Sequence, residues 1–253
     1  MDPIVLSLLA CLMMLSGAMI GIQLRRKLAG HHLDEHTKDI VRLGASLVAT
    51  IVALVLGLLI NSSNAAFEAQ RSEVRHIAAN LILLDHLLEG YGPEAHPIRL
   101  LLRRGVDELV QHVWQTRDMP LDAAPMMGPG STASQVLIAI HALPAPDNVH
   151  RTVQGQAVQV AMDTARVRLT LFERAQASIP YAIYSALVFW MTALFASFCL
   201  FTPVNRAAAV ALIVIALSAS VALFLILELD QAFAGLMRIS SHAFAQILPP
   251  LAP

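Results

Sequence analysis

Apolar residues are concentrated in four long uncharged runs along the chain. The runs lie between Asp2 and Arg25, between Arg42 and Glu68, between Arg174 and Arg206, and between Arg206 and Glu228. Each run reaches the roughly 20 apolar residues that a helix needs to cross about 30 Å of hydrocarbon. A buried helix of a soluble core can look like one such run. Four of them, with most of the charge confined elsewhere, predict four transmembrane helices.

Short connections between these runs predict two antiparallel hairpins. The expected helices run from about Ile4 to Leu24, Ile40 to Ile60, Pro180 to Thr202 and Arg206 to Leu227. Arg25, Arg26 and Lys27 follow the first run, and no basic residue precedes it. That order is the reverse of a secretory signal, so we expect a retained membrane helix. Both termini and the central region then lie on one side of the membrane.

The central region has the periodicity of amphipathic helices. One face carries Phe67, Val74, Ile77, Leu81, Leu84 and Leu88, so the second membrane helix is predicted to continue to about Glu89. Gly90, Gly92 and Pro93 then predict a stop and a restart. The next helix has the stripe Ile98, Leu102, Val106, Leu109 and Val113, and the Pro- and Gly-rich stretch 119–130 is predicted to be a loop.

Two further helices complete the central region. One is predicted from about Ser131 to His141, and the last is capped by Asp147 and runs toward Pro180. The predicted fold class is therefore all-α, an integral membrane protein with a helical extramembrane domain built on extended second and third membrane helices. The expected divisions are a hairpin at 1–60, the helical domain at 61–179, a second hairpin at 180–228 and a tail at 229–253. The tail is predicted to be amphipathic through Phe233, Leu236, Met237, Phe244 and Ile247.

Composition agrees with a membrane protein, because 57% of the residues are hydrophobic and only 14% are charged. Both lysines, Lys27 and Lys38, lie in or beside the first loop, close to Arg25 and Arg26. Basic residues in short loops favour the cytoplasm, which places the helical domain outside. A group of arginines flanks the membrane on the opposite side and weakens this assignment: Arg71, Arg75, Arg166, Arg168 and Arg174.

The sequence contains no enzyme motif. It has no glycine-rich phosphate loop followed by lysine, no nucleophile elbow and no zinc-protease helix, so neither an enzyme nor a cofactor is predicted. Cys11 and Cys199 lie in apolar runs and offer no disulfide framework. The first loop is rich in metal-binding residue types, but a solvated loop explains it better than a metal site does. Those residues are His31, His32, Asp34, Glu35, His36 and Asp39.

The second membrane helix carries the candidate functional residues. Ala45, Ala49, Ala53 and Gly57 recur at every fourth position, a stripe that lets another helix approach closely and that we interpret as packing rather than pore lining. Asn61, Ser62, Ser63 and Asn64 form a polar collar where the helix leaves the bilayer. The collar is either ordinary interfacial solvation or the mouth of an aqueous path. The same alternatives apply to Glu228 and Asp230 at the end of the fourth helix.

Several segments resemble the bestrophin-like bacterial membrane family. They are LGASLVATIVALVLGLLINSS after His31 and His32, AANLILLD at 78–85, YGPE at 91–94, FWMTALFASFCLF from Phe189 and FLILELD at 224–230. Cys199 stands where we expect a glycine and Ala232 where we expect a proline. The consecutive acidic residues with which bestrophins clasp calcium are absent, so calcium gating is not implied.

The resemblance implies a multi-pass protein of the bacterial plasma membrane with remote kinship to pentameric anion channels. The leading hypothesis is thus a homo-oligomeric anion channel in the lipid bilayer. The alternative is a non-conducting scaffold or sensor whose helical domain binds a partner protein. No nucleic acid partner is expected. True bestrophins would favour a cytoplasmic helical domain, opposite to the charge pattern, so both orientations stay open.

Overall fold

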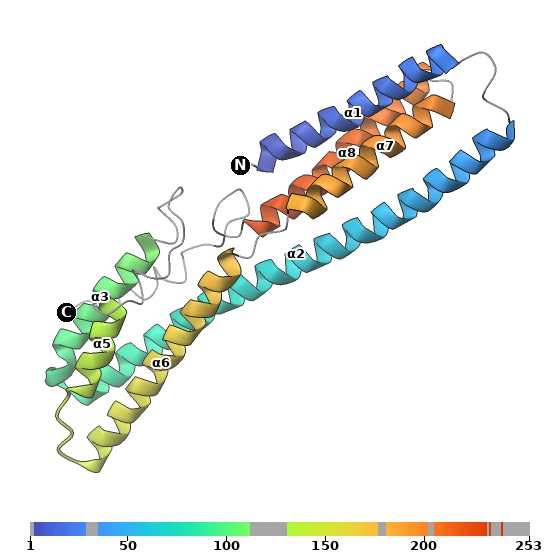
Figure 1. Cartoon of the computed structure of the whole chain (residues 1–253). Coiled ribbons are helices and arrows are strands. Elements are labelled where there is room, and N and C mark those ends of the chain that lie inside the picture. Colours follow the sequence, from blue (N-terminus) through green and yellow to red (C-terminus); the bar gives the residue numbers. More distant parts are fainter. Residues whose placement is uncertain are drawn as a thin grey trace. The chain divides into compact units, whose positions relative to one another are not determined.

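The structure, a computed structural model, describes residues 3–28, 35–111, 131–176, 181–201, 205–231, 233 and 239. These residues form seven α-helices and one short 3-10 helix, with no β-strand among them (Figure 1). The α-helices are α1 (Pro3–Leu28), α2 (Glu35–Tyr91), α3 (His96–Val110), α5 (Thr132–His141), α6 (Asn148–Gln176), α7 (Tyr181–Phe201) and α8 (Arg206–Asp230), and the 3-10 helix is η1 (Pro93–Ala95). The predicted all-α class is confirmed.

Four of these helices, α1, α2, α7 and α8, are long and apolar enough to cross a membrane. The 57-residue α2 continues past the predicted membrane boundary, as the periodicity indicated. The chain divides into two compact units. The membrane unit comprises residues 1–65 and 179–230, and the helical unit comprises residues 66–178 and 231–253. The predicted boundaries at residues 60, 179 and 228 stay a prediction, because they concern which residues lie in the bilayer.

In the membrane unit α1 packs against both α7 and α8. The backbone of α1 approaches α7 closely at Gly17 and Gly21, where an added Cβ would overlap the carbonyl oxygens of Thr192 and Ala196. Small residues four apart allow this kind of contact between membrane helices. Two hydrogen bonds join α1 to its neighbours: the Tyr184 hydroxyl of α7 donates to the Leu6 carbonyl at 2.8 Å, and the Ser220 hydroxyl of α8 donates to the Ser7 carbonyl at 2.6 Å.

We expect Gly21→Ala to destabilise the membrane unit by about 1–3 kcal/mol, the usual cost of overpacking a tight contact. The new methyl group would meet the Ala196 carbonyl, and a backbone cannot move aside as a flexible side chain can. Gly44→Ala is the matched control, because a Cβ at Gly44 has open space around it. Thermal unfolding of the purified protein measures both changes. Equal melting temperatures for the two variants would contradict this packing.

The helical unit is built around a core shared by the second half of α2 and by α3, α5 and α6. Its most deeply buried side chains include Val74, Ile77, Leu84, Leu88, Val106 and Ile140. The chain turns from α2 into η1 at Gly92, which has a φ of 116°, a conformation that glycine adopts without strain. The predicted stop and restart is confirmed, with α2 ending at Tyr91.

Polar contacts tie the helices of this unit together. Arg99 on α3 donates to both carboxylate oxygens of the buried Asp85 on α2, at 2.7 and 2.9 Å. That hydrogen bonding raises the pKa of Arg99, while burial opposes the shift. Asn80 donates to Asp163 of α6 at 2.8 Å, and the Tyr91 hydroxyl donates to the Pro144 carbonyl at 2.5 Å. Three of these residues, Asn80, Asp85 and Tyr91, lie in the segments that carry the family resemblance.

Side-chain caps begin two helices of this unit, and the one at Asp147 was predicted. Ser131 caps α5 by accepting a hydrogen bond from the Ser134 amide at 3.3 Å. The carboxylate of Asp147 accepts from the His150 amide at 2.8 Å at the start of α6. These bonds satisfy amide groups that have no acceptor within the helix. At the other end of α5, the Gln154 side chain donates to the carbonyl of Ile140 at 2.9 Å.

Some predicted features lie outside the described residues. They are the loop at 119–130, His31, His32 and Asp34 of the histidine-rich loop, the side chains of Glu35 and His36, and the tail residues Leu236, Met237, Phe244 and Ile247. Of the predicted tail, Ile239 is buried in the core of the helical unit and Phe233 packs against that core. At least these two side chains are therefore covered by protein rather than by a membrane surface.

Candidate functional site

The membrane portion of α2 is the least covered of the four apolar helices. Only 6% of an 18-residue apolar stretch of α2 is buried within the chain, against 33% of the corresponding stretches in α1 and in α7. This part of α2 contacts the other helices of the membrane unit along one face, where Val52 is buried. A cavity of about 480 Å³, lined partly by Val48 of α2 and Trp190 of α7, separates the two helices over part of that face.

The uncovered surface of α2 has two different faces. The first is aliphatic and consists of Leu43, Leu47, Ile51, Leu54 and Leu58, which are 43–71% exposed. The second is small and polar and consists of Ser46, Thr50, Ala53, Gly57, Asn61 and Asn64, all exposed. Members of the second set, which we call the polar stripe, are three or four residues apart and therefore share one side of a helix of 3.6 residues per turn.

The polar stripe contains no charge and no large side chain. The Ser46 hydroxyl donates to the Leu43 carbonyl at 2.8 Å, and the Thr50 hydroxyl donates to the Ser46 carbonyl at 2.9 Å. Both hydroxyl protons are thus used within the helix, and each hydroxyl oxygen can still accept a hydrogen bond. The asparagine side chains are costly to leave in hydrocarbon without partners, and the stripe as a whole is suited to water or to a second polar helix surface.

The predicted small-residue stripe is divided between two faces. Ala45 and Ala49 are half-buried against the membrane unit, whereas Ala53 and Gly57 are exposed and belong to the polar stripe. Positions four apart advance about 40° around a helix at each step, so three steps move the stripe by about a third of a turn. Strict every-fourth spacing therefore does not keep all four residues against one partner.

The predicted collar and acids also separate. Asn61, Ser62 and Asn64 are exposed, while Ser63 is buried. Glu228 is 3% exposed and Asp230 is half-buried. Glu228 therefore does not face solvent as a carboxylate at an open mouth would. Sequence analysis missed Ser46 and Thr50, although their spacing to Gly57 and Asn61 was visible as a helical face.

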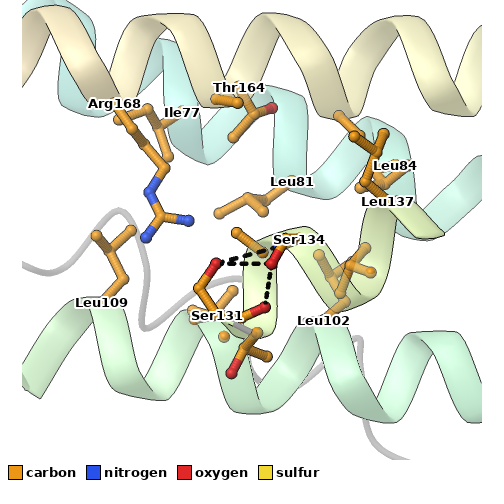
Figure 2. Close-up of a pocket in the computed structure, with 17 residues that line it drawn as sticks. Ile77, Leu81, Leu84, Leu102, Leu109, Ser131, Ser134, Leu137, Thr164 and Arg168 are labelled. Carbon is orange, nitrogen blue, oxygen red and sulfur yellow. Dashed lines mark hydrogen bonds between the residues drawn. The ribbon is translucent and has the colours of Figure 1, made fainter. Parts of the chain in front are cut away.

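A second feature lies in the helical unit and was not predicted. A cavity of about 210 Å³ is lined by residues of α2, α3, α5 and α6, and Figure 2 shows the Arg168 guanidinium extending into it. Arg168 is 9% exposed, and its Nε has no hydrogen-bond partner among the described residues. Burial lowers the pKa of Arg168, and the charge of Glu108 opposes that shift. In the sequence, Arg168 counted among the basic residues that flank the membrane. Because the side chain is buried, it no longer bears on which side of the membrane the helical unit lies.

Comparison with protein families decides the relationship that the motifs suggested. A model of the Bestrophin-like domain matches residues 12–244. The chain belongs to the Bestrophin-like family. The match includes the middle of the chain, which the motif resemblance did not cover. No curated protein matches the sequence.

Solved structures share the fold of this bestrophin-like chain from end to end. A point variant of a bacterial bestrophin homolog from Klebsiella pneumoniae has a TM-score of 0.72 at 18% identity, covering 99% of this chain and 98% of that one. Another structure of the Klebsiella pneumoniae homolog has a TM-score of 0.68 at 18% identity, covering 98% and 96%. A variant described as a membrane protein has a TM-score of 0.71 at 18% identity, also covering 98% and 96%. The chain is thus a bestrophin-like membrane protein.

Proposed function

We propose that the protein is a homo-oligomeric ion channel in which the polar stripe of α2 lines the conducting path. The single observation that carries this proposal is the uncharged, small-residue surface that α2 leaves uncovered through its membrane portion. One chain alone would present Ser46, Thr50 and Asn61 to lipid. A ring of chains would turn these residues toward water and leave the aliphatic face toward lipid or toward neighbouring subunits.

Anions are the proposed permeant ions, on the strength of family kinship. The polar stripe has no acidic residue that would repel an anion, and its serine, threonine and asparagine groups resemble the neutral linings of weakly binding pores. Glu228 is assigned to holding the end of α8, because it is buried and interacts within the protein. No enzymatic activity is expected of such a protein.

The alternative is a non-conducting scaffold or sensor whose helical unit binds a partner protein. Chloride efflux from liposomes containing the purified protein distinguishes the two. The channel proposal expects protein-dependent efflux that rises with the amount of oligomer in the membrane. Well-folded protein that gives no flux with any anion tested would favour the scaffold.

The proposed location is the bacterial plasma membrane. Charge in the first loop favours an external helical unit, and family kinship favours a cytoplasmic one. Val149 is 69% exposed at the start of α6 and suits a labelling test. An impermeant thiol reagent reaches Val149→Cys in intact cells only if the helical unit is external, provided that the reagent crosses any outer envelope. Labelling only after the plasma membrane is opened would establish the cytoplasmic orientation.

A further inference from the structure

We propose that the helical unit contains a binding site for a small aliphatic carboxylate, with Arg168 binding the carboxylate and the α2–α3–α5–α6 cavity holding the hydrocarbon tail. The site goes beyond the channel proposal, and all of its residues lie within the helical unit. Its presence or absence is therefore independent of whether the protein conducts.

The first argument is the state of Arg168. An arginine side chain stays protonated in proteins, so this largely buried group brings a positive charge into an apolar core. Buried charges are ordinarily paired or fully hydrogen-bonded, because desolvation is costly. Here Nε has no partner among the described residues. Glu108 is the acid that influences Arg168, but it is exposed and accepts a 2.7 Å hydrogen bond from Thr132.

The second argument is the helix end that meets the same cavity. Helix α5 begins beside the Arg168 guanidinium, and Figure 2 shows Ser131 and Ser134 on the side that it approaches. Amide groups of the first turn have no acceptor within the helix, and the helix dipole favours an anion there. Ser131 caps the Ser134 amide, and Thr132 and Ala133 carry the other two amide donors of this first turn. Cation and helix terminus together are suited to a carboxylate.

The third argument is the shape and lining of the rest of the cavity. Away from Arg168 it is bounded by aliphatic side chains, among them Leu81, Leu84, Leu102 and Val136. An apolar cavity of about 150 Å³ accepts a six-carbon ring. The 210 Å³ found here therefore suits a ligand with a tail of about six carbons and one charged end. A phospholipid with two long chains is too large for this volume.

Hexanoate is the probe for this site. Equilibrium dialysis of labelled hexanoate against the full chain in lipid nanodiscs, with empty nanodiscs as the blank, measures binding without competing detergent. We expect saturable binding of one hexanoate per chain. Hexanol and acetate should each bind at least tenfold more weakly, because one lacks the charge and the other lacks the tail.

Variants locate the binding. Arg168→Met should weaken hexanoate binding at least tenfold, whereas Arg166→Met, an exposed arginine two residues away on the same helix, should leave it unchanged. Ala161→Leu keeps Arg168 and fills the cavity, so it should also weaken binding at least tenfold, and it decides the matter if Arg168→Met fails to fold. No saturable hexanoate binding to the parent protein would overturn the proposal. Binding unaffected by Ala161→Leu, or hexanol binding as tight as hexanoate binding, would overturn it as well.

Discussion

Replacing Arg99 by leucine is expected to lower the stability of the helical unit by about 3–5 kcal/mol, the usual cost of removing one partner from a buried ion pair. Asp85 would remain almost fully buried with its carboxylate stripped of two short hydrogen bonds. Glu89, which lies 4.0 Å from the Arg99 guanidinium, is largely exposed and is a weak second partner. For a unit of this size the melting temperature should fall by about 10 °C or more.

Two comparisons separate this effect from a general loss of charge. Arg104→Leu removes an exposed arginine from the same helix and should change stability by no more than about 0.5 kcal/mol. Arg99→Leu combined with Asp85→Leu should regain much of the loss, because no buried charge is then left unpaired. Scanning fluorimetry of the purified variants measures all three. A double variant as unstable as Arg99→Leu alone would show that the pair matters through something other than charge burial.

The second large effect is expected at Gly57. In the proposed assembly each subunit contributes this residue to the conducting path, so Gly57→Leu adds one leucine side chain per subunit at the same level. Anion flux should fall at least tenfold while the mass of the oligomer stays the same. Gly44→Leu makes the same exchange off the polar stripe, where open space is available, and should conduct like the parent. Undiminished flux in Gly57→Leu would remove this position from the pore.

Local features of the fold were predictable from the sequence. Helix ends depend on neighbouring residues, so Ser131, Asp147 and the turn at Gly92 could be identified from capping chemistry and backbone preference alone. The continuity of α2 could be predicted because its apolar residues keep helical spacing without interruption. These features need no knowledge of which helix lies beside which.

Partnerships between helices were much less predictable. Gly17 and Gly21 form a small-residue pair that was visible in the sequence, yet nothing there identified α7 as its partner. The stripe from Ala45 to Gly57 was visible too, but the 40° advance at every fourth residue divides it between a covered face and an exposed face. The sequence pattern therefore indicated where small-residue surfaces lie but not which helix packs against each of them.

Arg168 shows the same limit for charge. In the sequence it stands among other arginines near a membrane segment and has the ordinary role of an interfacial cation. Its burial depends on α2, α3 and α5, whose side chains line the same cavity although they lie well before Arg168 in the chain. The residues of the family motifs, by contrast, are largely structural in the helical unit, as the bonds of Asn80, Asp85 and Tyr91 show.

The measurement that tests the central claim most directly is cysteine modification on α2 during anion flux. Thr50→Cys and Asn61→Cys place thiols on the polar stripe, and Leu47→Cys and Leu54→Cys place them on the aliphatic face. The background carries Cys11→Ala and Cys199→Ala, so only the introduced thiol can react. A charged, water-soluble thiol reagent should reduce flux through the two stripe variants and leave the two aliphatic-face variants unaffected. Flux that is blocked from the aliphatic face instead, or that no stripe modification alters, would contradict a pore lined by the polar stripe.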